Sequence, residues 1–142
     1  MIAYADTSFL VSLFARDALS ATAITAAEAV PPFLVNPLHR AEFENAIGLC
    51  EFRRQLNAAE ARAVRANFIR QLTDGVYLAR PWPEGAWAAA ENLSHRFAVR
   101  LGVRTLDVLH VAAALESDAP DFYTLDARQR RLARLAGLRC HP

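Results

Sequence analysis

Short apolar runs alternate along the chain with longer stretches in which apolar residues recur every three or four positions. The short runs are typical of strands buried on both faces, and the longer stretches predict amphipathic helices. The predicted strands comprise residues 2–4, 33–36, 76–79 and 122–125, with 138–140 as a short fifth candidate. The predicted helices comprise residues 7–17, 20–29, 38–56, 57–72, 81–102, 106–116 and 127–137.

Several helix boundaries follow from local residue chemistry. Asn36 and Asn57 are expected to be N-cap residues, because an Asn side chain accepts hydrogen bonds from the free N–H groups of a first helical turn. Pro37 fits that first turn, since its missing N–H is not needed there. By the same reasoning, Thr105 is expected to cap the helix 106–116, and Gly102 to end the helix 81–102.

The alternation of strands and helices predicts an α/β protein with a three-layer α/β/α sandwich around a mostly parallel sheet of four or five strands. Its 142 residues suffice for one hydrophobic core, so residues 1–142 are expected to form a single domain. A hydrophobic fraction of 54% with 22% charged residues excludes a disordered chain. We find neither a run of about 18 uncharged apolar residues nor a basic leader, and we expect a cytoplasmic protein.

Charge and cysteine content change this interpretation little. The net charge of +1 does not by itself indicate a nucleic-acid-binding protein, although all 16 basic residues are Arg. After Asp126 the chain contains Arg but no acid, which fits either a solvated helix face or a phosphate-binding patch. Cys50 and Cys140 are expected to be small buried side chains, and their spacing indicates no zinc site.

A carboxylate within an apolar helix is the first sign of a functional site. Asp107 lies in the sequence "RTLDVLHVAAAL", which has no face polar enough to be simply solvated. Burying an unpaired carboxylate costs several kcal/mol as an order of magnitude, unless the group takes up a proton. A negative charge in the first helical turn is favoured by roughly 0.3–1 kcal/mol, which offsets part of that cost. Asp107 therefore either has a purely structural role at the start of the helix or is stabilised by a bound cation.

Three further acids occupy comparable positions. Asp6 lies where the first predicted strand gives way to a helix, Asp126 directly follows the strand 122–125, and Glu42 lies in the early turns of the helix after the second strand. The carboxyl ends of parallel strands share one edge of a sheet, where ligands bind in these folds. The first turn of the Asp107 helix can face the same edge, so we expect the four acids to line one crevice.

Clustered carboxylates raise each other's pKa unless a cation joins them. Mg²⁺ or Mn²⁺ fits such a site, because both take oxygen ligands in octahedral geometry. Such an ion polarises a phosphoryl oxygen and lowers the pKa of bound water. Since the sequence has no glycine-rich phosphate loop, the pattern predicts phosphodiester hydrolysis rather than nucleotide-driven transfer.

Four blocks of the chain resemble the PIN-domain ribonucleases. They are "YADTSFLVSLF", "LHRAEFENAI", "RTLDVLHVAAAL" and "FYTLDARQRRLARLAGL", which occur in the family's order and span nearly the whole chain. Within the family, the chain is most similar to the VapC-type toxins of bacterial toxin–antitoxin pairs.

This resemblance implies a PIN-like fold and a Mg²⁺-dependent endoribonuclease in which Mn²⁺ can substitute. It implies a quartet of catalytic and metal-binding acids, namely Asp6, Glu42, Asp107 and Asp126. It implies three supporting residues, namely Ser8, Asn45 and Thr124. It also implies an RNA substrate, a homodimer, and a small VapB-like antitoxin that covers the acidic crevice.

Purely structural roles compete with several of these assignments. The hydroxyls of Ser8 and Thr124 can simply satisfy main-chain donors. Helix capping is the structural alternative for Asp126. His110, although one turn from Asp107, is expected to be a hydrogen-bonded core residue rather than a general base. Alternatives for the whole protein are a housekeeping PIN nuclease that processes structured RNA or DNA, and an RNA-binding protein that does not cleave.

Overall fold

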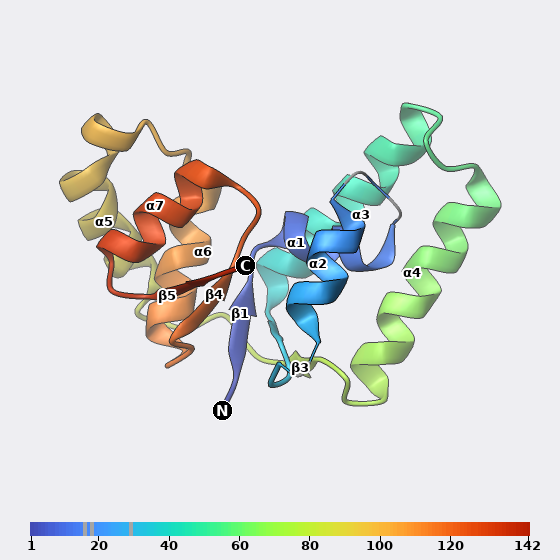
Figure 1. Ribbon diagram of the computed structural model, residues 1–142, viewed down its shortest axis with the longest axis horizontal. Helices are drawn as coiled ribbons and strands as arrows, with labels where there is room; N and C mark the ends of the chain where they lie inside the picture. Colours follow the sequence, from blue (N-terminus) through green and yellow to red (C-terminus); the bar gives the residue numbers. More distant parts are fainter. Residues whose placement is uncertain (16, 18, 29) are drawn as a thin grey trace.

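Parallel strands lie in the middle of the computed structural model, with helices on both sides (Figure 1). The structure describes residues 1–15, 17, 19–28 and 30–142. Its strands are β1 (Ala3–Ala5), β2 (Leu34–Val35), β3 (Leu78–Ala79), β4 (Asp121–Tyr123) and β5 (Arg139–His141). Its helices are α1 (Thr7–Phe14), α2 (Ser20–Ala27), α3 (Pro37–Phe52), α4 (Ala58–Thr73), α5 (Ala86–Leu101), α6 (Thr105–Glu116) and α7 (Ala127–Leu135).

The described strands form two parallel ladders. One has the order β1-β4-β5, and the other pairs β2 with β3. A parallel bridge between Ala3 and Phe33, together with a hydrogen bond from the Ala3 N–H to the Pro32 carbonyl (3.3 Å), joins the ladders. The α/β fold with parallel strands is therefore confirmed, but the sheet is divided because only this isolated bridge pairs the described segment before β2 with β1.

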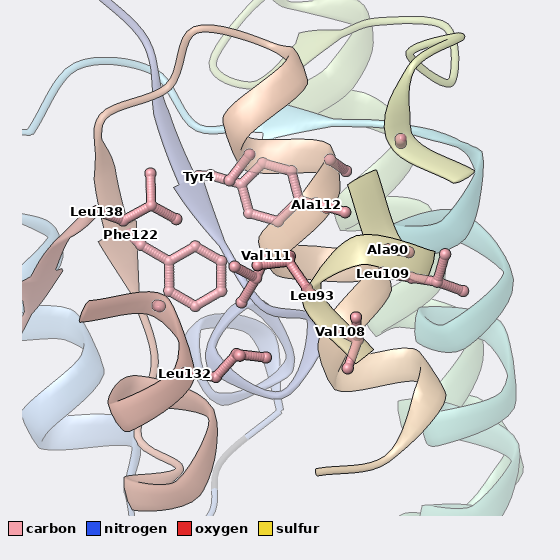
Figure 2. Packing of buried hydrophobic residues seen from close by; sticks show 14 of the residues in the cluster. Tyr4, Ala90, Leu93, Val108, Leu109, Val111, Ala112, Phe122, Leu132 and Leu138 are labelled. Carbon is pink, nitrogen blue, oxygen red and sulfur yellow. The ribbon is translucent and has the colours of Figure 1, made fainter. Parts of the chain in front are cut away.

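Side chains alternate along the strands, and this alternation separates two hydrophobic cores. Tyr4 and Phe122 belong to the core shared with α5, α6 and α7, whereas Ala5 and Tyr123 belong to the core shared with α1, α3 and α4. Figure 2 shows the first core, in which the rings of Tyr4 and Phe122 are stacked with centroids 5.6 Å apart. Helices thus cover both faces of the strands, as the predicted three-layer arrangement requires.

The two predicted Asn caps are confirmed. The side-chain oxygen of Asn36 accepts a hydrogen bond from the His39 N–H (3.2 Å) at the start of α3. That of Asn57 accepts one from the Glu60 N–H (2.8 Å) at the start of α4. Gly102 follows the last residue of α5 with a φ of 60°, the left-handed conformation that glycine adopts without strain.

Other predicted boundaries are wrong by a few residues. Thr105 is the first residue of α6 rather than its cap, because the extended backbone of Arg104 already fills the cap position. α5 begins at Ala86 instead of residue 81, since a turn with a hydrogen bond from the Ala86 N–H to the Pro83 carbonyl (3.1 Å) precedes it. β4 ends at Tyr123, where the chain turns towards the start of α7.

Several predicted helices also end early. α1 ends at Phe14 and α2 at Ala27, and Arg16 and Ala29, inside the predicted helices 7–17 and 20–29, lie outside the described residues. α3 ends at Phe52 because Arg54, with a φ of 58°, leaves the helical conformation. Among the described residues, no helix combines the length and apolar character needed to cross a membrane.

Candidate functional site

Asp6 occupies the junction between β1 and α1 and is 3% exposed. As the N-cap of α1, its Oδ1 accepts hydrogen bonds from the Phe9 N–H (2.7 Å) and the Ser8 hydroxyl (2.8 Å). Its Oδ2 accepts a hydrogen bond from the Thr124 hydroxyl. Burial raises the pKa of Asp6, whereas the hydrogen bonds from Thr124, Phe9 and Ser8 lower it. Both supporting hydroxyls expected from the sequence therefore contact Asp6.

Glu42 lies in α3 and reaches across to two other elements. Its Oε1 accepts a hydrogen bond from the Thr7 hydroxyl (3.0 Å) and lies 2.5 Å from His110 Nε2 in α6. Glu42, Ser8 and Asn45 line one groove of about 570 Å³. The Glu42 carboxylate is thus held by α1 and α6 while facing a groove that a ligand can enter.

Asp107 lies in the first turn of α6, where Arg104 pairs with it. The Asp107 Oδ2 accepts a hydrogen bond from Arg104 Nε (3.1 Å), and the side chains are 15% and 76% exposed, respectively. Asp107, and after it Asp126 and Glu42, raise the pKa of Arg104. One exposed guanidinium therefore lies within the electrostatic influence of three of the four predicted acids.

Asp126 is the N-cap of α7. Its Oδ1 accepts a hydrogen bond from the Gln129 N–H (2.8 Å), and its own N–H donates to the Thr124 hydroxyl (3.1 Å). Helix capping is therefore part of the role of Asp126 in this structure. Its side chain is half-buried, and the same Thr124 hydroxyl joins it to Asp6.

Gln129 is a buried residue of the site that sequence reasoning missed. Its Oε1 lies 3.1 Å from the Thr124 hydroxyl, and its Nε2 donates to the Asp107 carbonyl (3.3 Å). With its N–H bound to Asp126, Gln129 connects the chain segments that carry Asp107 and Asp126, and it reaches Asp6 through Thr124. No motif or periodicity distinguishes a glutamine in the basic helix 127–137, so these contacts become visible only in the fold.

The start of α1 connects two hydrogen-bonded groups. Asp6 belongs to a group with Thr124 and Gln129, and the adjacent Thr7 belongs to a group with Glu42 and His110. Each of the four acids has its own donor, and within the described residues no three acid, histidine or cysteine side chains are arranged as a ready metal site. The assignment of the quartet as metal ligands therefore stays a prediction.

The chemistry of this donor set fits Mg²⁺ or Mn²⁺. All four acids offer carboxylate oxygens, the ligands that these ions prefer. Across the part of the chain that the structure describes, no hydrogen bond reaches Glu42 Oε2, Asp107 Oδ1 or Asp126 Oδ2. Each of these three carboxylates thus keeps one oxygen free for an ion, while its other oxygen is held by the protein.

These features define the molecule as a parallel α/β protein with acids at the carboxyl ends of its strands. Its family follows from comparison with known families. The PIN domain profile matches residues 3–135, and the chain belongs to the PIN domain family. The resemblance to PIN domains found in the sequence is thereby confirmed.

Several solved structures are similar to the chain over nearly its full length. VapC20 from Mycobacterium tuberculosis, a Sarcin-Ricin loop cleaving toxin, has a TM-score of 0.70 and 22% identity, with 100% of both chains covered. VapBC2 from Rickettsia felis, bound to a DNA fragment from its promoter, has a TM-score of 0.68 and 12% identity, covering 99% of this chain and 98% of that one. FitAcB from Neisseria gonorrhoeae has a TM-score of 0.62 and 14% identity, and the match covers 100% of this chain and 97% of that one.

At these identities the likeness establishes the fold alone. No curated protein sequence compared with the chain matches it significantly.

Proposed function

We propose that this protein is a metal-dependent endoribonuclease that hydrolyses RNA phosphodiester bonds, and that it is the toxin of a VapBC-type toxin–antitoxin pair. The observation that carries the proposal is the position of the acids. Asp6 and Asp126 follow adjacent parallel strands and share contacts with the Thr124 hydroxyl, and Asp107, Asp126 and Glu42 all act on the charge of Arg104. Its membership of the PIN domain family and its structural similarity to VapC20 support the same function.

Asp6, Glu42, Asp107 and Asp126 would hold Mg²⁺, with Mn²⁺ as a substitute. A bound ion of this kind lowers the pKa of a water molecule and polarises a phosphoryl oxygen. Ser8 and Thr124 fix the Asp6 carboxylate by hydrogen bonds to its two oxygens. Arg104, an exposed guanidinium beside three of these acids, suits contact with the RNA phosphate.

The groove beside Glu42 supports an antitoxin as the partner. Its lining combines Glu42 and Asn45 with apolar side chains, including Val11, Leu49 and Leu106. Leu49 and Leu106 are exposed, and an exposed apolar patch beside an acidic site is typical of a surface that another chain covers. We assign this groove to a VapB-like antitoxin and expect a homodimer, which light scattering of the purified protein will check.

The test compares two glutamates of α3 that lie two residues apart. Glu42 belongs to the site, whereas Glu44 forms an ion pair with Arg65 (2.7 Å) on the surface. Because Glu42 is held by Thr7 and His110 beside the groove, Glu42→Gln is expected to lower RNA cleavage at least 100-fold, the usual scale for loss of a group that stabilises the reacting charge. Glu44→Gln is expected to cleave like the wild type in an assay of labelled RNA with Mg²⁺.

Asp107→Asn is expected to behave like Glu42→Gln, and a chelator should abolish cleavage by the wild type. Full activity of either variant, or cleavage that persists in EDTA, contradicts the metal-site assignment. Mapping the cleaved ends across total cellular RNA then separates a toxin with one preferred site from a housekeeping nuclease with many substrates.

A further inference from the structure

His110 is a buried histidine that connects three elements of the site. It is 2% exposed and lies in α6, one turn after Asp107. Its Nδ1 lies 2.9 Å from the Tyr4 hydroxyl of β1, and its Nε2 lies 2.5 Å from Glu42 Oε1 in α3. One ring therefore joins the core beneath the site to a carboxylate of the site itself.

The direction of these hydrogen bonds follows from the neighbouring donors. Asn36 Nδ2 donates to the Tyr4 oxygen (3.2 Å), so the Tyr4 hydroxyl proton is left to point at His110 Nδ1. Burial raises the pKa of Tyr4 far above its ordinary value, so the phenol keeps that proton. If Nδ1 accepts, the ring proton of a neutral His110 is on Nε2, where it donates to Glu42.

A neighbouring histidine shows what a purely structural role looks like in the same core. The His39 ring centroid lies 5.0 Å from that of His110, and His39 is equally buried. Its Nδ1 accepts from the Asn36 N–H (3.1 Å) and its Nε2 donates to the Ala5 carbonyl (2.8 Å), so its ring is satisfied by main-chain groups. His110 instead bonds to side chains at both nitrogens.

We propose that His110 is a positioning residue that orients the Glu42 carboxylate for metal binding, with Tyr4 setting its tautomer. This inference rests on the proposed metal-dependent function. The hydrogen bonds from His110 and Thr7 hold Glu42 Oε1, and they leave Oε2 as the oxygen available to an ion. Because Asp107 lies one turn away in the same helix, α6 both supplies one acid and fixes the orientation of another.

Mn²⁺ binding to the full chain, measured by isothermal titration calorimetry, tests the proposal without depending on cleavage. Loss of a side chain that orients a metal ligand costs about 10- to 100-fold in metal affinity. His110→Phe, which keeps a ring but removes both hydrogen bonds, is expected to weaken Mn²⁺ binding at least 10-fold. His110→Gln keeps an N–H donor and is expected to recover part of that loss.

Tyr4→Phe is the second variant, and it remains informative if His110→Phe does not fold. It is expected to weaken Mn²⁺ binding measurably, because His110 loses the group that fixes its tautomer. Tyr77→Phe is the matched control, since Tyr77 is a buried tyrosine of the other core and does not contact His110. Wild-type Mn²⁺ affinity in Tyr4→Phe and in every His110 variant that folds overturns the proposal.

A double-mutant cycle separates positioning from general structural support. If His110 acts through Glu42, His110→Gln has no further effect on Mn²⁺ affinity in a Glu42→Gln background. If His110→Gln lowers the Mn²⁺ affinity of the wild type and of Glu42→Gln by the same factor, the positioning role is overturned. Nitrogen-15 NMR of the metal-free protein gives an independent result: we expect the His110 proton on Nε2, and a proton on Nδ1 alone overturns the assigned hydrogen-bond direction.

These measurements also separate this inference from the proposed function. If Mn²⁺ binds as expected and the variants weaken it, but no RNA is cleaved, the nuclease fails while the positioning role stands. If the wild type binds Mn²⁺ and the variants bind it equally well, only the positioning role fails. If the wild type binds no Mn²⁺, both are overturned.

Discussion

Thr124 illustrates how single hydrogen bonds organise the acidic site. Its hydroxyl contacts the buried Asp6 carboxylate, accepts from the Asp126 N–H and lies beside the Gln129 side-chain oxygen. A buried carboxylate is stable only when such donors offset the loss of water. Thr124 thereby links the acid that follows β1 with the acid that follows β4.

Thr124→Val is expected to lower the free energy of unfolding by about 1–3 kcal/mol, because a buried carboxylate loses a donor. Chemical denaturation at neutral pH measures the change. Thr73→Val is the control: the Thr73 hydroxyl only donates to the Ile69 carbonyl on an exposed helix surface, and the expected change is below about 0.5 kcal/mol. Equal effects of the two substitutions contradict the importance assigned to Thr124.

Sequence reasoning selected the four acids, but the hydrogen-bond partners of each acid could not be inferred from local patterns. Ser8, predicted as a supporting residue, contacts Asp6, whereas Gln129 and Arg104 were not predicted at the site. Glu42 and His110, which are joined by a hydrogen bond, are 68 positions apart in the chain. Such pairs depend on how helices pack, which periodicity does not specify.

At the scale of elements, the long helices could be predicted and the short strands could not be bounded. The starts of α3 and α4 were predicted within one residue. Both helices have a capping box, in which the side chain of the cap residue and the side chain of the third helical residue each accept a hydrogen bond from the other residue's main-chain N–H. β2 and β3 consist of two residues each, so their ends depend on a few main-chain hydrogen bonds. An apolar run of four residues predicts a strand but not its pairing.

Asn57→Ala is expected to destabilise the protein by about 1 kcal/mol, because the first turn of α4 loses its cap. Asn57→Asp keeps a capping oxygen and is expected to retain wild-type stability. Among the described residues, none of the hydrogen bonds at the acidic site involves α4, so RNA cleavage by Asn57→Ala should be unchanged while the protein is folded. Thermal unfolding followed by circular dichroism, with a cleavage assay on the same samples, checks both expectations.

Asp121 stabilises the pairing of β4 with β5. Arg139 donates two hydrogen bonds to its carboxylate (2.9 and 2.7 Å), and His141 lies 2.9 Å from it. The hydrogen bond from Arg139, followed by that from His141, lowers the pKa of Asp121 from 3.8 to about 2. A carboxyl group with a lowered pKa stabilises the fold above its unfolded pKa and loses this effect as the pH falls towards its folded pKa.

Asp121→Asn is therefore expected to be less stable than the wild type at pH 7, with the difference shrinking between pH 3.8 and about pH 2. Denaturant unfolding across this pH range measures the effect, which should also weaken at high salt. Asp118→Asn, a change of the same charge at an exposed position, is the control. A stability difference for Asp121→Asn that does not depend on pH contradicts the role assigned to the ion pair.

For the whole molecule, the proposed metal site links ligand binding to stability. An ion that binds only the folded protein stabilises it by about 2.7 kcal/mol at a free concentration 100 times its Kd. Mn²⁺ is therefore expected to raise the Tm of the wild type and of Glu44→Gln. Glu42→Gln should show a smaller increase, measured by differential scanning fluorimetry, and an increase equal to that of the wild type contradicts the assignment of Glu42.

The division of the strands into two ladders has a mechanical consequence for the proposed metal site. Glu42 follows β2 on one side of the division, whereas Asp6 and Asp126 follow β1 and β4 on the other. In the described part of the chain, a single β-bridge at Ala3 and Phe33 joins the ladders, and side chains of both ladders share one hydrophobic core, so the spacing between Glu42 and the other acids depends on this packing as well as on strand pairing. Under the proposed function, a substitution that shifts this packing is expected to change metal affinity without altering any carboxylate.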